Sequence, residues 1–258
     1  MRSLKQALRD GETLIGTWLN ASSPSQAEII GYAGFDFVVL DTEHSSYDLD
    51  TAEDLVRAAD AAQLPALLRV SENTGAAVAK ALDSGAQGVV VPHVGTADEA
   101  RRAVRHAHYA PHGVRGAAPT VRATRYGQIS WPDYLVHARS HTLVVLQIEG
   151  KQGLANLDEI MAADGVDVLF VGPFDLSESL GVSGQLDHPV LLGAVGEIVE
   201  RARARSIALG IWMPTPEQTF RWIERGVQIV TVANNDMIFT EGCRAIVRQI
   251  RSGRREAI

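Results

Sequence analysis

The sequence has few of the features that mark secreted and membrane proteins. Cys243 is its only cysteine, so no disulfide can form within the chain. Met1 is followed by a polar stretch instead of the apolar core of a signal peptide, and no apolar run reaches the length that crosses a bilayer. The sequence therefore predicts a cytoplasmic protein without a membrane anchor.

Clustered positive charge and a phosphate-binding turn are also missing. The formal net charge is −7 and the arginines are spread along the chain, so no nucleic-acid surface is predicted. No Gly-x-Gly-x-x-Gly turn follows the first predicted strand. This absence disfavours an open, doubly wound sheet that binds a dinucleotide.

Apolar runs that alternate with amphipathic segments are the main pattern in the chain. Buried parallel strands produce such runs, and crossover helices produce such segments. The strands are predicted at 13–19, 35–41, 66–69, 88–92, 142–149, 166–172, 208–212 and 228–233. The helices are predicted at 49–62, 75–84, 96–108, 154–163, 189–206 and 215–225. Eight such units in 258 residues predict an α/β fold, a single-domain (β/α)₈ TIM barrel over residues 1–258.

Local signals refine this prediction. Thr96 and Glu99 have the spacing of a capping box, and Gly226 follows the last turn of its predicted helix. The long connection at 109–131 is rich in Gly, Pro and Arg, which is typical of functional or interfacial loops. The polar tail at 252–258 is expected to fray.

Two carboxylates follow consecutive predicted strands. Glu149 ends the fifth strand, and the sixth runs through Gly172-Pro173-Phe174 to Asp175. Catalytic groups of such barrels lie at the carboxyl ends of the strands, so both can converge on one divalent cation, Mg²⁺, Mn²⁺ or Co²⁺. Open positions on this ion would accept the carboxylate and keto oxygens of a 2-oxo acid. The alternative is that both residues only cap or pair with the following helices.

A cation and an imidazole are predicted at the same mouth. Arg69 ends the third strand, and its guanidinium fork suits a substrate carboxylate. An ion pair with Asp41 or Glu43 is the alternative. His44 follows the second strand and is the candidate proton-transfer group, whereas His93 is expected to have a supporting or structural role.

Four segments resemble the HpcH/HpaI aldolase/citrate lyase family of class II pyruvate aldolases, over nearly the whole chain. The segments are Ala33-Gly34-Phe35-Asp36-Phe37 leading to Asp41-x-Glu43-His44, Gly113-Val114-Arg115-Gly116 with Arg122-Ala123, Gln147-Ile148-Glu149, and Val171-Gly172-Pro173-x-Asp175-Leu176-Ser177.

The resemblance implies a metal-dependent lyase that cleaves 4-hydroxy-2-oxo acids to pyruvate and an aldehyde. It implies that Glu149 and Asp175 hold the metal, that Arg69 grips pyruvate and that His44 is the base. Asp83 from a neighbouring subunit would assist His44, and Gln147 would line the pocket. The implied assembly is a homohexamer of domain-swapped dimers, with the C-terminal helix exchanged between subunits.

Some residues depart from the family pattern on the aldehyde side of the pocket. Phe174 and Trp212 are bulky and are expected to contact substrate, and Gly150-Lys151-Gln152-Gly153 follows Glu149. The acceptor aldehyde therefore stays open. Oxaloacetate decarboxylation, or lyase and condensing reactions of other 2-oxo acids, are alternatives that use the same metal site.

Two further explanations remain at this stage. A Schiff-base enzyme would use Lys151 instead of a metal, and borohydride trapping with pyruvate would reveal it. A barrel kept only for binding or assembly would lack Arg69, His44, Glu149 or Asp175, and all four are present.

Overall fold

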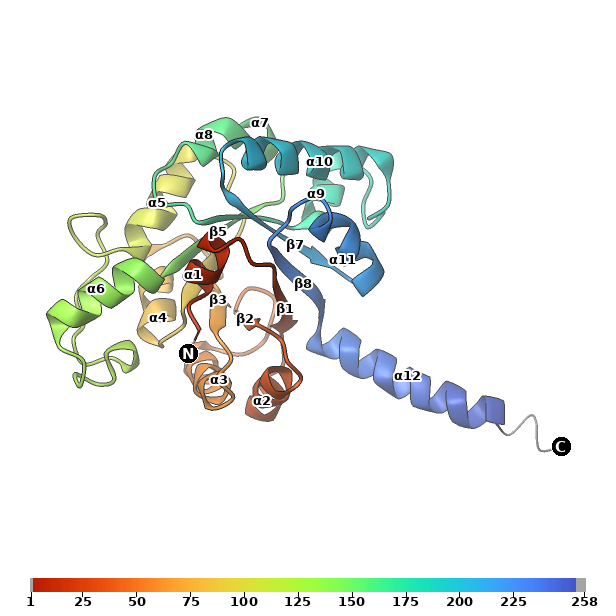
Figure 1. Cartoon of the computed structure of the whole chain (residues 1–258), viewed down its shortest axis with the longest axis horizontal. Helices are drawn as coiled ribbons and strands as arrows, with labels where there is room; N and C mark the ends of the chain where they lie inside the picture. Colours follow the sequence, from red (N-terminus) through yellow and green to blue (C-terminus); the bar gives the residue numbers. More distant parts are fainter. Residues whose placement is uncertain (1, 254–258) are drawn as a thin grey trace.

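A computed structural model describes residues 2–253 as a closed barrel of parallel strands (Figure 1). Each strand pairs with the next one along the chain, and β8 pairs with β1. The predicted barrel is therefore confirmed and the open sheet is excluded. The strands are β1 Leu14–Leu19, β2 Phe37–Asp41, β3 Ala66–Arg69, β4 Gly88–Val91, β5 Leu143–Ile148, β6 Val168–Val171, β7 Ala208–Met213 and β8 Ile229–Asn234.

Helices cover the outside of the barrel. Those that sequence periodicity predicted are α3 Leu49–Ala61, α4 Gly75–Asp83, α5 Ala97–Ala107, α10 Pro189–Ala204 and α11 Pro216–Ile223. The helix predicted at 154–163 is divided into α7 Lys151–Ala155 and α8 Leu157–Met161. The helices for which no residue range was predicted from the sequence are α1 Leu4–Arg9, α2 Pro24–Tyr32, α6 Trp131–His141, α9 Pro173–Leu180 and α12 Asn235–Gly253.

The helix-end signals predicted from the sequence are present at α5 and α11. Thr96 and Glu99 form both hydrogen bonds of a capping box at the start of α5. Gly226 has a φ of 92° after α11, a left-handed conformation that glycine adopts without a steric cost. The connection at 109–131 contains a short 3₁₀ helix, Arg122–Thr124. Fraying was expected at 252–258, but α12 continues to Gly253 and the remaining residues lie outside the described part.

The barrel interior is filled with apolar side chains and closed at one end. Phe37, Phe170 and Leu67 belong to this inner cluster, and Leu4 and Leu8 of α1 pack against the amino ends of the strands as part of it. The amino end of the barrel is therefore plugged. Space for a ligand is left at the carboxyl ends of the strands.

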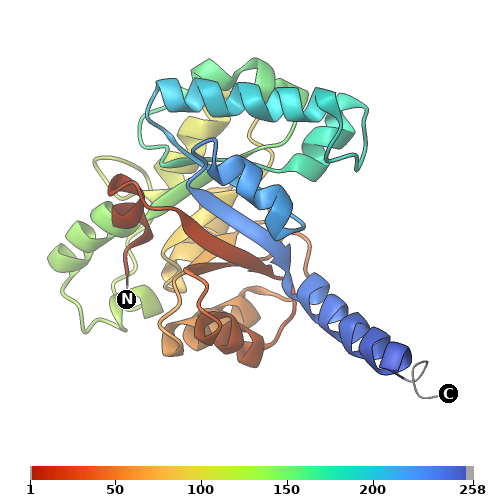
Figure 2. The same cartoon turned by 45° about the vertical axis from the view of Figure 1, so that its right-hand side comes forward.

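Helix α12 extends away from the barrel after β8 (Figures 1 and 2). Its apolar side chains lie in solvent, with Phe239 70% exposed and Ile246 59% exposed. The outer face of β8 keeps a cavity of about 230 Å³, lined in part by Ile15, Phe220 and Val230. An apolar helix and an apolar slot are thus both left uncovered. Among residues 2–253, no helix has the length and hydropathy needed to span a membrane.

Candidate active site

A cavity of about 250 Å³ opens at the carboxyl ends of the strands. Five residues predicted to form the site line it: His44, Arg69, Phe174, Asp175 and Trp212. Three further lining residues were not predicted from the sequence: Trp18, Asn20 and Asn234. Asn20 and Asn234 follow or end strands, so the position rule that selected Arg69 could have found them.

Arg69 is held by two carboxylates. Its Nε and Nη2 donate to Oδ1 and Oδ2 of Asp41 at 2.9 and 2.6 Å, and Nη1 lies 3.1 Å from Glu43 Oε2. Its guanidinium also stacks over Trp18, 4.4 Å from the ring centroid. The fork that was expected to face a substrate carboxylate is therefore occupied by Asp41, and the ion pair considered as the alternative is present.

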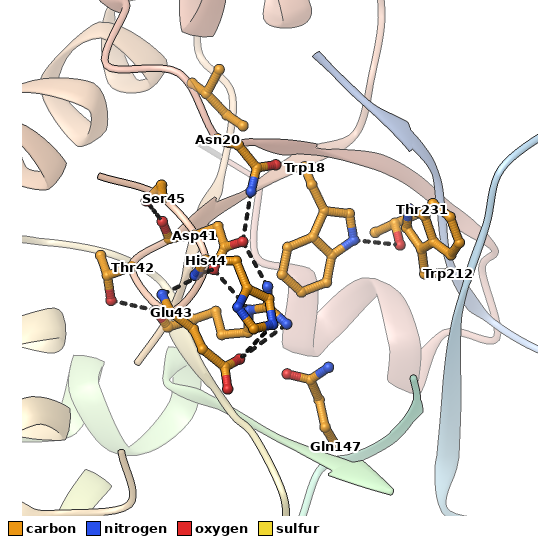
Figure 3. Close-up of polar contacts among 12 residues, drawn as sticks. Trp18, Asn20, Asp41, Thr42, Glu43, His44, Ser45, Gln147, Trp212 and Thr231 are labelled. Carbon is orange, nitrogen blue, oxygen red and sulfur yellow. Dashed lines mark hydrogen bonds and ion pairs between the residues drawn. The ribbon is translucent and has the colours of Figure 1, made fainter. Parts of the chain in front are cut away.

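Asp41 organises this side of the pocket. Burial would raise its pKa, but the hydrogen bonds and charge of Arg69 outweigh burial and lower the pKa below 3.8. Asp41 Oδ1 also accepts the backbone N–H groups of Glu43 and His44, and Oδ2 accepts from Asn20 (Figure 3). One buried carboxylate thus fixes both Arg69 and the loop that carries His44.

His44 is placed to meet a substrate. Its side chain is 60% exposed, and Nε2 lies 3.9 Å from Glu43 Oε2. The ring lines the cavity while its backbone is held by Asp41. The imidazole is therefore available for proton transfer within the pocket.

Glu149 is a buried carboxylate with both oxygens in polar contact. Oε1 accepts the backbone N–H of His93 at 2.7 Å, and Oε2 accepts from Nε2 of Gln147 at 3.1 Å. A Cβ on Gly172 would lie 2.4 Å from Glu149 Oε2, so only glycine permits this approach to the start of α9. Burial raises the pKa of Glu149 against the lowering effect of His93, and the charges of Asp175 and Glu43 raise it further.

Asp175 lies in a helix and not at the end of a strand. Strand β6 ends at Val171, and Pro173 begins α9 with Asp175 in its first turn. The extended run expected from Gly172 to Asp175 is therefore wrong, because Pro173 favours the first helical position. No side chain caps this end of α9, and its first residues line the cavity. Such an end suits an anionic ligand.

The residues present fit a divalent metal ion. Glu149 and Asp175 supply carboxylate oxygens, and the charge of Asp175 raises the cost of negative charge on Glu149, which a cation would offset. Oε1 of Gln147 is buried without a hydrogen-bond partner among the described residues. Within residues 2–253, no three His, Cys, Asp or Glu side chains form a metal-binding cluster. A cation held by two carboxylates alone would have coordination positions left for water and substrate.

Asp83 and Lys151 lie outside this cavity. Asp83 ends α4 and forms an ion pair with Arg115, with 2.6 Å between Oδ1 and Nη2. Helix α4 leads back to the amino end of the barrel, so Asp83 does not reach the pocket of its own chain. Its predicted role in a neighbouring subunit stays a prediction. Lys151 is exposed at the start of α7.

Two aromatic rings form one side of the cavity. Phe174 of α9 meets Trp212 of β7 edge to face, with 6.2 Å between ring centroids. Trp212 Nε1 donates to the carbonyl of Ala233, whereas Phe174 is 55% exposed. The Trp212 ring is thus anchored, and Phe174 lies on it at the rim.

Comparisons with known proteins agree with this architecture. A family model described as HpcH/HpaI aldolase/citrate lyase matches residues 14–241. A hydroxypyruvate/pyruvate aldolase of Roseobacter denitrificans is 35% identical over 98% of both chains. A 2-dehydro-3,6-dideoxy-6-sulfogluconate aldolase of Pseudomonas putida is 38% identical over 86% of both chains. The crystal structure of a HpcH/HpaI aldolase/citrate lyase family protein from Burkholderia cenocepacia superposes with a TM-score of 0.91 at 34% identity, covering 96% of this chain and 98% of that one.

Proposed function

The chain belongs to the HpcH/HpaI aldolase/citrate lyase family, and from this premise we propose that it cleaves 4-hydroxy-2-oxo acids to pyruvate and an aldehyde with the help of a divalent metal ion. It is a carbon–carbon lyase of the aldolase type. The observation that carries the proposal is the buried carboxylate of Glu149, with Asp175 close enough to raise its pKa, beside a cavity that holds Arg69 and His44.

Different residues of the site would bind the metal ion and the individual groups of the substrate. Glu149 and Asp175 would hold the metal ion, which supplies a Lewis acid that polarises the 2-oxo group and stabilises negative charge on its oxygen. The uncapped N–H groups of α9 suit the substrate carboxylate. Arg69 has N–H groups beyond those that Asp41 accepts, and they would donate to the 2-oxo oxygen. Gln147 Oε1 can accept from a hydroxyl group or a water molecule.

Cleavage then requires one base and a group that accepts the electron pair of the C3–C4 bond. His44 takes the proton of the C4 hydroxyl, a C=O bond forms at C4, and the C3–C4 bond breaks to release the aldehyde. The electron pair of that bond moves onto the 2-oxo unit and gives the enolate of pyruvate. Arg69, which Asp41 already holds in position, would donate to the oxygen on which this charge develops. A proton delivered to C3 completes pyruvate, and the reverse sequence adds pyruvate to an aldehyde.

Metal removal tests this function. Protein stripped of metal with EDTA should lose cleavage of 4-hydroxy-2-oxo acids, and Mn²⁺ or Mg²⁺ should restore it. Glu149→Gln should stay folded and bind Mn²⁺ far more weakly than wild type. Glu197→Gln, an exposed glutamate on α10, is the matched control and should match wild type.

Product analysis distinguishes the remaining reactions. Pyruvate and aldehyde released in equal amounts support aldol cleavage. Carbon dioxide from oxaloacetate, with no turnover of any hydroxy-oxo acid, would instead make decarboxylation the main reaction. Full activity after stringent metal removal would contradict the proposal.

The proposed assembly uses α12. Its exposed residues and the uncovered slot beside β8 are both apolar, and α12 begins at Asn235 directly after β8 and leads away from the barrel of its own chain (Figure 1). A second copy can fill the slot with its own α12, which yields a closed dimer. Three such dimers would form the predicted hexamer.

Light scattering tests the exchange of α12. Replacement of Ile246 and Ile250, which are 59% and 57% exposed, by Asp should reduce the particle mass below that of wild type. Replacement of Arg244 and Arg251 on the same helix by Ala is the control and should keep the mass. An unchanged mass in the Asp variant would contradict the exchange.

A further inference from the structure

His93 has an unusual conformation at the edge of the site. It follows β4, and its φ of 54° is a left-handed conformation that few residues other than glycine and asparagine adopt readily. Its backbone N–H donates to Glu149 Oε1 at 2.7 Å, and ring Nδ1 lies 2.9 Å from the same oxygen. Its other ring nitrogen, Nε2, lies 3.0 Å from Glu43 Oε1. The residue therefore contacts two carboxylates through its backbone N–H and both ring nitrogens.

These contacts form one continuous polar chain across the mouth, from Arg69 through Glu43 and His93 to Glu149. Glu43 uses Oε2 for Arg69 and Oε1 for His93. Glu149 uses Oε1 for His93, so Oε2 is the oxygen turned toward Gln147 and the start of α9. The plane of the Glu149 carboxylate is thus fixed from one side. The position of Arg69 is linked to it through Glu43.

We propose that His93 is a positioning residue that clamps Glu149 so that Oε2 faces the cation site, and that keeps Glu43 in place behind Arg69. The proposal rests on the proposed function, in which Glu149 is a metal ligand. Without the ring contact on Oε1, the Glu149 carboxylate could turn about its own axis. Oε2 of Glu149 would then no longer keep a single orientation toward the cation site. Groups that orient a metal ligand in this way usually contribute about 10- to 100-fold to metal affinity.

Two substitutions distinguish the contribution of the His93 ring from that of its backbone N–H. His93→Asn and His93→Gly both accept a left-handed conformation and keep the N–H that donates to Glu149, but they lack a ring that reaches Glu43. His112→Asn, an exposed histidine in the loop after α5, is the matched control. The dissociation constant of Mn²⁺ is measured on metal-free proteins from the electron paramagnetic resonance signal of free Mn²⁺. Melting temperatures are recorded on the same samples.

The expected result is a dissociation constant for Mn²⁺ about 10- to 100-fold higher in both His93 variants, with His112→Asn equal to wild type. Activity at low Mn²⁺ should fall by a similar factor, and saturating Mn²⁺ should restore kcat to within about tenfold. A role limited to folding would lower the melting temperature without this rescue. His93→Gly relieves backbone strain, so it gives the result even where His93→Asn folds poorly.

Failure of the proposal for His93 can be distinguished from failure of the proposed function. Wild-type Mn²⁺ affinity in a folded His93→Gly protein overturns the role of His93 and leaves the proposed function intact. A wild-type protein that binds no Mn²⁺ and cleaves substrate without it contradicts the proposed function itself.

Discussion

Asp41→Asn is the substitution for which the structure predicts the largest loss of stability within the site. Asp41 Oδ2 accepts from Arg69 Nη2 and from Asn20, while Oδ1 accepts from Arg69 Nε and from two backbone N–H groups. An asparagine places an NH₂ group at one of these two positions. In either orientation that NH₂ meets donors and no acceptor.

The magnitude follows from burial. Asp41 is 1% exposed and Arg69 is 7% exposed, so the substitution leaves a guanidinium in the interior with Glu43 as its remaining charged partner among residues 2–253. Breaking a buried ion pair by removing one partner costs about 3–5 kcal/mol. We expect the free energy of unfolding to fall by that amount at pH 7, measured by urea denaturation at a fixed protomer concentration.

The stabilisation that Asp41 contributes depends on pH in a defined direction. The folded-state pKa of Asp41 is lowered from its ordinary value of 3.8, so the carboxylate binds a proton more readily in the unfolded chain. Its stabilisation is complete above pH 3.8 and is lost as the pH falls through the lower folded-state pKa. The difference in unfolding free energy between wild type and Asp41→Asn should therefore narrow below pH 3.8.

An exposed pair supplies the control. Asp54 contacts Arg57 on the surface of α3, and its side chain is 64% exposed, so Asp54→Asn should cost less than about 1 kcal/mol. Equal unfolding free energies for Asp41→Asn and Asp54→Asn would refute the reasoning. So would a difference from wild type that does not narrow as the pH falls below 3.8 and through the lower folded-state pKa of Asp41.

Three further substitutions test individual roles. His44→Ala should lower kcat by about 10²- to 10⁴-fold through loss of the base while the affinity for Mn²⁺ stays at the wild-type value, and normal turnover would contradict the role of His44. Arg69→Ala should raise the KM for the 2-oxo acid in steady-state assays, so an unchanged KM would exclude it from the binding site. Phe174→Ala should widen the rim and raise kcat/KM for larger acceptor aldehydes relative to small ones, measured across an aldehyde series, and an unchanged ratio would place the acceptor elsewhere.

The sequence by itself determined the barrel and predicted five of the residues that line the cavity at its mouth. Strands buried on both faces must be continuously apolar, so the runs ending at Arg69 and before Glu149 were visible without any structure. The end of each run also marks the mouth, where His44 was expected and lies. These properties depend on residues that are neighbours along the chain.

Only the tertiary structure decided how the polar groups are paired. Asp41 and Arg69 are opposite each other in the register of β2 and β3, and this register places the carboxylate, not a substrate, on the guanidinium fork. The link from Glu43 through His93 to Glu149 depends on the left-handed conformation after β4, and the direction of α12 depends on where the chain leaves β8. Strand register and side-chain orientation arise from contacts between distant segments, so spacing along the sequence does not contain them.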